Sequence, residues 1–149
     1  MGNCTENPEY YKECVELLEE LGTQDVEFLG QVNVKEHLPD IDLLLLSSIS
    51  EGQPLAMLEG MAAEIPFVAT NVGDCKSLLE GREGDTLGSA GIVVPVMNSE
   101  KMAEAVIRCI RNPKLCRRMG RTGRERVETF YRKDRMLGEF YKLYGDLGR

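Results

Sequence analysis

Two glutamates eight residues apart carry the most specific chemistry in this 149-residue chain. Glu51 lies in the polar segment 47–53, and Glu59 lies in a helix-forming segment that begins at Pro54. A carboxylate can accept hydrogen bonds from two hydroxyl groups, and the first N–H groups of a helix can bind phosphate oxygens. This spacing therefore suits a ligand that carries both hydroxyls and phosphates.

A nucleotide sugar has this chemistry, because it presents a ribose diol, two phosphates and a sugar with several hydroxyls. In this interpretation Glu59 accepts from the ribose hydroxyls, and Glu51 holds a hydroxyl of the donor sugar. The backbone N–H groups of Leu55 and Ala56 then face the phosphates. The spacing alone also fits a Glu51 that only stabilises the helix N-terminus and a Glu59 that is merely exposed.

The elements around these glutamates alternate between strands and helices. Apolar runs predict strands at 26–29, 43–46, 67–70 and 92–96. Helical spacing predicts helices at 8–21, 34–38, 54–63, 75–79, 99–111, 114–119, 122–131 and 133–147. This order indicates an α/β fold, a Rossmann-like, mainly parallel sheet with helices on both faces and a helical C-terminal tail. In such a sheet ligands bind beyond the carboxyl ends of the strands, where segment 47–53 falls.

The composition is that of a globular protein, with 42% apolar and 29% charged residues. No apolar run approaches the roughly 20 residues of a membrane span, and no signal-peptide pattern opens the chain, so we expect a cytoplasmic location. The five cysteines include no C-x-x-C pair, which favours reduced thiols. The single histidine, His37, argues against a histidine metal site or a Ser-His-Asp relay.

Charge is distributed unevenly along the chain. Residues 1–107 hold 20 acids and 5 bases, whereas residues 108–149 hold 5 acids and 13 bases. The basic side chains between 108 and 126 have almost no aromatic residue among them, which disfavours nucleic acid as a partner. We interpret them as a solvated helical face, and the alternative is contact with an anionic membrane surface or an acidic partner.

Residues 47–70 closely resemble the E-x7-E signature of the family 4 retaining GT-B glycosyltransferases, E-G-F-G-L-P-x-x-E-A-M-A-x-G-x-P-V-I-A-T. The chain reads E-G-Q-P-L from Glu51, L-E-G-M-A from Leu58 and I-P-F-V-A-T from Ile65. Together with F-L-G from Phe28 and L-G-S-A-G-I-V-V-P from Leu87, it looks most like the Pel exopolysaccharide group, PelF. The similarity runs from about Pro8 to the C-terminus.

This resemblance implies a UDP-sugar donor, transfer of a hexose with retention, no cofactor and no metal. It also implies a polysaccharide or glycolipid acceptor, while the basic residues between 108 and 126 allow peripheral association with a membrane or membrane complex. It assigns Glu51 as the catalytic residue that contacts the donor sugar and Glu59 as the ribose ligand. The implied donor-binding residues are Glu51, Gly52, Gln53, Pro54, Leu55, Ala56, Glu59 and Gly73.

The chain departs from the family pattern at two positions in the motif. Pro54 replaces the second glycine of E-G-F-G and has no N–H to donate, so donation shifts to Leu55 and Ala56. Glu64 stands where the family has a helix-terminating glycine, which puts that helix cap in doubt.

The family's diphosphate-binding Arg and Lys would lie before residue 1. We therefore expect residues 1–149 to form part of a C-terminal nucleotide-sugar-binding domain, without its first strand-helix-strand and without the N-terminal, acceptor-binding domain. Residues 113–149 form the helical tail. This part alone is expected to be inactive, and the aromatic stripe near Phe140 invites dimerisation through the tail.

Two other functions compete with the glycosyltransferase. A flavodoxin-like or receiver-like module would bind partners without catalysis, but a receiver needs an Asp at the end of a strand, and the turns here offer Glu51 and Asp74 instead. A dehydrogenase would need the G-x-G-x-x-G turn, which the chain lacks.

Overall fold

The computed structural model describes residues 7–147 and divides the chain into two compact units, Met1–His37 and Leu38–Arg149. The first unit contains α1 (Pro8–Glu20) and α2 (Val34–His37). Asn7 caps α1 by accepting the Tyr10 N–H, and Gly22 follows its end at φ +64°. The predicted strand at 26–29 is wrong, because these residues are irregular and no described strand pairs with them.

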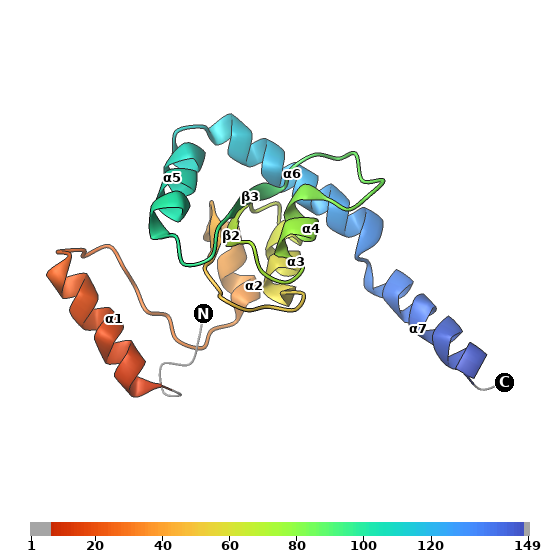
Figure 1. Cartoon of the computed structure of the whole chain (residues 1–149), viewed down its shortest axis with the longest axis horizontal. Coiled ribbons are helices and arrows are strands. Elements are labelled where there is room, and N and C mark those ends of the chain that lie inside the picture. Colours follow the sequence, from red (N-terminus) through yellow and green to blue (C-terminus); the bar gives the residue numbers. More distant parts are fainter. Residues whose placement is uncertain (1–6, 148–149) are drawn as a thin grey trace. The chain divides into compact units, whose positions relative to one another are not determined.

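The second unit is built on a sheet of three parallel strands (Figure 1). They are β1 (Leu44–Leu46), β2 (Phe67–Thr70) and β3 (Gly91–Val94), and β2 lies in the centre. All four residues of β2 are buried, as expected for a central strand covered on both faces. The α/β class with a parallel sheet is confirmed, although the third strand ends at Val94 rather than at 96.

Helices cover both faces of this sheet. On one face, α3 (Leu55–Ala62) and α4 (Cys75–Glu80) pack over Phe67 and Ala69. On the other face, α5 (Ser99–Ile110) and the first half of α6 (Pro113–Phe130) pack over Val68 and Val94. A short 3-10 helix, Leu38–Asp40, precedes β1. The contact between α3 and the sheet is close, because a Cβ on Gly60 would overlap the side chains of both Leu44 and Phe67.

The predicted helices 114–119 and 122–131 are one continuous helix, α6, so the expected interruption near Gly120 is wrong. A Cβ on Gly120 would collide with the carbonyl oxygen of Glu64. A Cβ on Gly123 would lie 3.3 Å from side-chain atoms of Met61. These glycines therefore allow α6 to approach α3 closely, and the packing gained offsets their low helix propensity.

The first part of the predicted tail belongs to the core, since Met119 and Arg126 of α6 are buried. The last helix, α7 (Lys133–Leu147), continues beyond α6 and away from the sheet (Figure 1). Its large apolar side chains, including Phe140 and Tyr144, are exposed, and these two rings stack with centroids 6.3 Å apart. None of the helices within residues 7–147 is long and apolar enough to cross a membrane.

Burial of Arg126 corrects the interpretation that the basic residues between 108 and 126 are all solvated. Its Nε donates to Asp85 Oδ2 at 2.6 Å, and both side chains are nearly inaccessible to solvent. Its Nη2 donates to Asp85 Oδ1 at 3.2 Å, and the two Nη groups also donate to the carbonyl oxygens of Leu78, Leu79 and Gly88. Arg126 thus fastens the glycine-rich loop 81–90 to α4 and α6.

Candidate functional site

The loop that carries Glu51 follows β1 and lies beside the turn that follows β2. The Thr70 hydroxyl, at the end of β2, donates to the carbonyl oxygen of Ser48 at 2.5 Å. The Asp74 N–H donates to the carbonyl oxygen of Gly52 at 2.8 Å. These bonds hold segment 47–53 and turn 71–74 together at the carboxyl edge of the sheet, where an open α/β fold binds its ligands.

Gly73 makes this contact possible. It adopts φ +49°, and a Cβ here would overlap the carbonyl oxygens of both Glu51 and Gly52. Any residue with a side chain would therefore push the two segments apart as well as strain the backbone. The family resemblance places Gly73 among the donor-binding residues, and the structure adds another role for it, close approach to the Glu51 loop.

The side chain of Glu51 is half-buried and accepts a hydrogen bond from the Ser48 hydroxyl at 2.7 Å. This bond uses Oε1 and orients the carboxylate. Glu59 lies on the exposed side of α3, together with Leu55 and Ala56. The spacing of these three residues places the glutamate one turn beyond the helix start on the same face.

Pro54 is the N-cap residue of α3, one position earlier than the first helical position that we predicted for it. It has φ −71° and ψ 113°, and no side chain caps the helix. The first N–H groups of α3, those of Leu55 and Ala56, therefore have no side-chain acceptor at the cap and face outward at the start of the helix. The replacement of the family glycine by Pro54 therefore does not remove these two N–H donors.

The end of α3 keeps the geometry expected of the family despite the loss of its glycine. Glu64 adopts φ +62°, and its N–H donates to Met61 O at 3.0 Å. The Ile65 N–H donates to Gly60 O at 3.0 Å. These two bonds form a Schellman motif with a glutamate in the left-handed position where glycine is preferred.

A network of polar side chains, which the sequence did not predict, also supports the Glu51 loop. Asp74 Oδ2 accepts from Gln53 Nε2 at 2.8 Å and from Arg82 Nη2 at 2.5 Å. The Arg82 guanidinium also lies 5.8 Å from the centroid of the Tyr131 ring. Burial acts to raise the pKa of Asp74, but hydrogen bonds from Gln53, Ser77 and Arg82 outweigh it and lower that pKa. Asp74 is a polar residue that follows a strand, so the sequence could have indicated it as a site residue. Nothing in the local sequence around Arg82 indicated its contact with Asp74.

Cavities of about 520, 500 and 280 Å³ occur in the second unit, and none of these three is lined by Glu51 or Glu59. The structure therefore brings the Glu51 loop, Gly73 and the start of α3 together at one edge of the sheet, and leaves Glu59 accessible on the helix beside them. This edge offers carboxylates, backbone N–H groups and a fixed loop to a polar ligand.

Comparison with known proteins identifies the family. Residues 1–112 match the sequence profile of the family described as glycosyl transferases group 1. The chain belongs to this glycosyl transferase family.

One relative of this group 1 chain is N-acetyl-alpha-D-glucosaminyl L-malate synthase of Bacillus anthracis. The two are 33% identical over 137 residues, which is 91% of this chain and 34% of that protein. The curated relatives that align with most of this chain are about three times as long, so the chain spans about a third of their length.

Solved structures show the same fold. Sucrose-phosphate synthase from Thermosynechococcus elongatus matches with a TM-score of 0.80 and 25% identity, over 91% of this chain and 34% of that chain. Anabaena HepE, determined with UDP-glucose, matches with a TM-score of 0.83 and 18% identity, over 94% of this chain and 38% of that chain.

Proposed function

We propose that this chain is the donor-binding part of a glycosyltransferase that takes a hexose from a UDP-linked sugar. The observation that carries the proposal is the Glu51 loop, fixed by the 71–74 turn at the sheet edge where α3 begins with uncapped N–H groups. Family membership supports sugar transfer. The complex of HepE with UDP-glucose, a protein of the same fold, supports the choice of donor.

Each residue has a separate role in this proposal. Glu59 accepts from the ribose diol, and Glu51 accepts from a hydroxyl of the donor sugar. The N–H groups of Leu55 and Ala56 contact the diphosphate. Both glutamates position the donor, while stabilisation of the departing diphosphate by N–H groups accelerates the reaction.

The finer assignments extend this proposal to the whole enzyme. We propose transfer with retention to a polysaccharide or glycolipid acceptor, in the cytoplasm and in exopolysaccharide synthesis of the Pel type, on the strength of the Glu51 to Thr70 motif. We also propose that no metal or cofactor takes part.

Titration of the ¹⁵N-labelled chain with UDP-glucose tests the proposal by NMR. Residues 1–107 carry a net charge of −15, so the diphosphate meets repulsion and we expect only weak, millimolar binding. The amide shifts should change at residues 51–53, at Leu55 and Ala56, at Glu59 and at Gly73. NMR detects such weak binding where calorimetry does not.

Glu59→Gln should weaken this binding by about five- to tenfold, because hydrogen bonds to a charged acceptor contribute about 1.5–3 kcal/mol and the amide retains part of them. Glu83→Gln is the matched control, since Glu83 is an exposed carboxylate in the loop after α4. Shifts confined to other surfaces, or an equal effect of both variants, would remove Glu59 and the Glu51 loop from the donor site.

A further inference from the structure

One surface of the second unit has an excess of positive charge that the donor site does not use. It comprises the last turn of α5, the connection to α6 and the first half of α6, and we call it the basic face. Its cations are Arg108, Arg111, Lys114, Arg117, Arg118 and Arg121, all exposed. None of these six has a carboxylate oxygen within 4.0 Å among the described residues.

Cations elsewhere on the second unit are mostly paired. Lys76 pairs with Glu80, Lys101 pairs with Glu104, and Arg132 pairs with Asp134. Among the acids near the basic face, Glu104 and Glu80 belong to two of these pairs and Glu64 lies 4.0 Å from Arg124. Asp42 lines the same cavity as Arg117, and Glu125 lies one turn after Arg121, but neither forms an ion pair with the basic face. The six cations therefore exceed the acids around them, and none is held in a close pair within the described residues.

The geometry of α6 presents these cations in one direction. Successive residues of an α-helix are rotated by about 100°, so positions 114, 117, 118 and 121 fall within roughly one third of the helix circumference. Met119 and Gly123, which face the core, lie on the opposite side. These four cations of α6 can thus approach one flat surface while the helix stays packed on the sheet.

Two isoleucines accompany the charge. Ile107 and Ile110, in the last turn of α5, are 45% and 70% exposed. They lie beside Arg108 and Arg111 on the same turn. Exposed apolar side chains among cations are typical of surfaces that lie in the interface of a bilayer.

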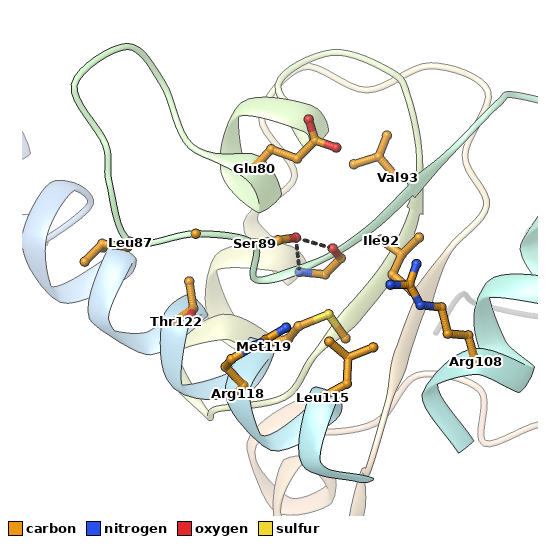
Figure 2. A pocket seen from close by; sticks show the side chains of 12 residues that line it. Glu80, Leu87, Ser89, Ile92, Val93, Arg108, Leu115, Arg118, Met119 and Thr122 are labelled. Atoms are coloured by element: carbon orange, nitrogen blue, oxygen red, sulfur yellow. Dashed lines mark hydrogen bonds between the residues drawn. The ribbon is translucent and has the colours of Figure 1, made fainter. Parts of the chain in front are cut away.

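The basic face also borders a cavity of about 520 Å³ at the free edge of β3 (Figure 2). Figure 2 shows Arg108 from α5 and Arg118 from α6 on the rim of this cavity, with Ser89 and Thr122 farther along its wall. Two guanidinium groups beside one opening offer several N–H donors to a phosphate. A phosphodiester headgroup fits this combination of charge and space.

We propose that the basic face docks the protein on an anionic phospholipid bilayer, with Ile107 and Ile110 inserted at the headgroup level. Electrostatics fixes the orientation of the second unit, because residues 38–107 hold 11 acids and 3 bases, a net −8 that the membrane repels, while residues 108–149 carry +8 and are attracted. Nucleic acid fits less well, since residues 98–129 contain no aromatic side chain on which bases can stack. This inference is independent of the donor site.

Vesicle co-sedimentation of the whole chain tests the proposal. Vesicles of phosphatidylcholine with 30% phosphatidylserine should bind the chain, pure phosphatidylcholine should not, and binding should fall as salt rises. Each Lys or Arg near an anionic surface contributes about fivefold to partitioning. The triple variant R111Q/R117Q/R121Q should therefore bind roughly 100-fold more weakly.

The control variant K76Q/K101Q/R132Q removes the same charge from exposed sites outside the basic face and should bind nearly as well as the wild type. Circular dichroism of both variants verifies that they are folded. An equal loss in the two variants, or binding to RNA or polyglutamate without binding to the vesicles, would refute membrane docking.

Insertion is tested separately with I110W, which introduces the sole tryptophan of the chain. Its fluorescence should shift to the blue on phosphatidylserine vesicles and stay unchanged with pure phosphatidylcholine. If the variant sediments with anionic vesicles but its emission does not shift, the α5 turn does not insert and that part of the proposal is wrong.

Discussion

Replacement of the buried Arg126 by methionine should be among the most damaging single substitutions in the second unit. The guanidinium makes two hydrogen bonds to Asp85, at 2.6 and 3.2 Å, and three to backbone carbonyl oxygens. Methionine fills a similar space but donates no hydrogen bond. Arg126→Met therefore removes the donor to the carbonyl oxygens of Leu78 and Gly88, and it leaves Leu79 O and the buried Asp85 carboxylate with one N–H each, from Ala90 and Leu87.

Removal of one partner from a buried ion pair costs about 3–5 kcal/mol, because the other charge stays buried. A domain of this size is stabilised by about 5–15 kcal/mol, so Arg126→Met should remove a large part of the free energy of unfolding. Arg124→Met is the matched control. Arg124 is half exposed and pairs with Glu128 at 2.9 Å, a type of contact that contributes about 0–1 kcal/mol.

The loss should depend on pH. The hydrogen bond from Arg126 lowers the pKa of Asp85 despite the opposing effect of burial. A carboxyl whose pKa is lower in the folded state stabilises the fold above its unfolded value of about 3.9, and this contribution is lost as pH falls through the folded value. The difference between wild type and Arg126→Met should therefore shrink from pH 7 to pH 3.

Urea unfolding followed by circular dichroism at 222 nm measures these free energies. The double variant D85L/R126M removes both charges and should be more stable than Arg126→Met alone, since no carboxylate is left buried. A loss below 1 kcal/mol for Arg126→Met at pH 7, or a loss equal to that of Arg124→Met, would show that the ion pair does not fasten the 81–90 loop as described.

The same unfolding assay tests three further substitutions. Gly120→Ala should lower the free energy of unfolding by about 1–3 kcal/mol, because the new Cβ meets Glu64 O. The control Gly138→Ala places its Cβ where nothing lies within 4 Å and should stabilise by up to about 1 kcal/mol. A neutral Gly120→Ala would contradict the close approach of α6 to α3. Glu64→Gly should stabilise by about 0.5–1 kcal/mol by relieving the left-handed backbone, and a loss of stability would show that the Glu64 side chain matters more than its φ. Asn112→Ala should cost about 1 kcal/mol, since its side chain caps α6 by accepting the Leu115 N–H at 3.1 Å, and an unchanged midpoint would mean that the cap is dispensable.

Local patterns predicted the elements that lie closest to the candidate site. The strand 67–70 was predicted at its observed bounds, because the apolar run follows Pro66 and ends at a turn. The helix carrying Glu59 was predicted to within a residue at each end. Pro54, its predicted first residue, is the N-cap residue. Predicted and observed helix ends differ by a residue because they depend on the backbone dihedral angles, which the residue types do not fix.

Features that depend on distant partners were not predictable in this way. The strand expected at 26–29 requires a neighbouring strand, which local sequence cannot supply. A glycine within a helical segment resembles a break until the carbonyl oxygen of Glu64 is seen beside Gly120. Similarly, Arg126 resembled its solvated neighbours, because its partner Asp85 lies 41 residues away.

The contact between Gly73 and the Glu51 loop bears on the entropy of ligand binding. A loop that is ordered only by its ligand must lose conformational freedom at that moment, at a cost of about 1–2 kcal/mol for each residue that becomes fixed. Here the Asp74 N–H and the Thr70 hydroxyl already hold the loop in the free chain. The edge therefore meets an incoming ligand as a preorganised surface, and most of the binding free energy can go into affinity and selectivity instead of loop ordering.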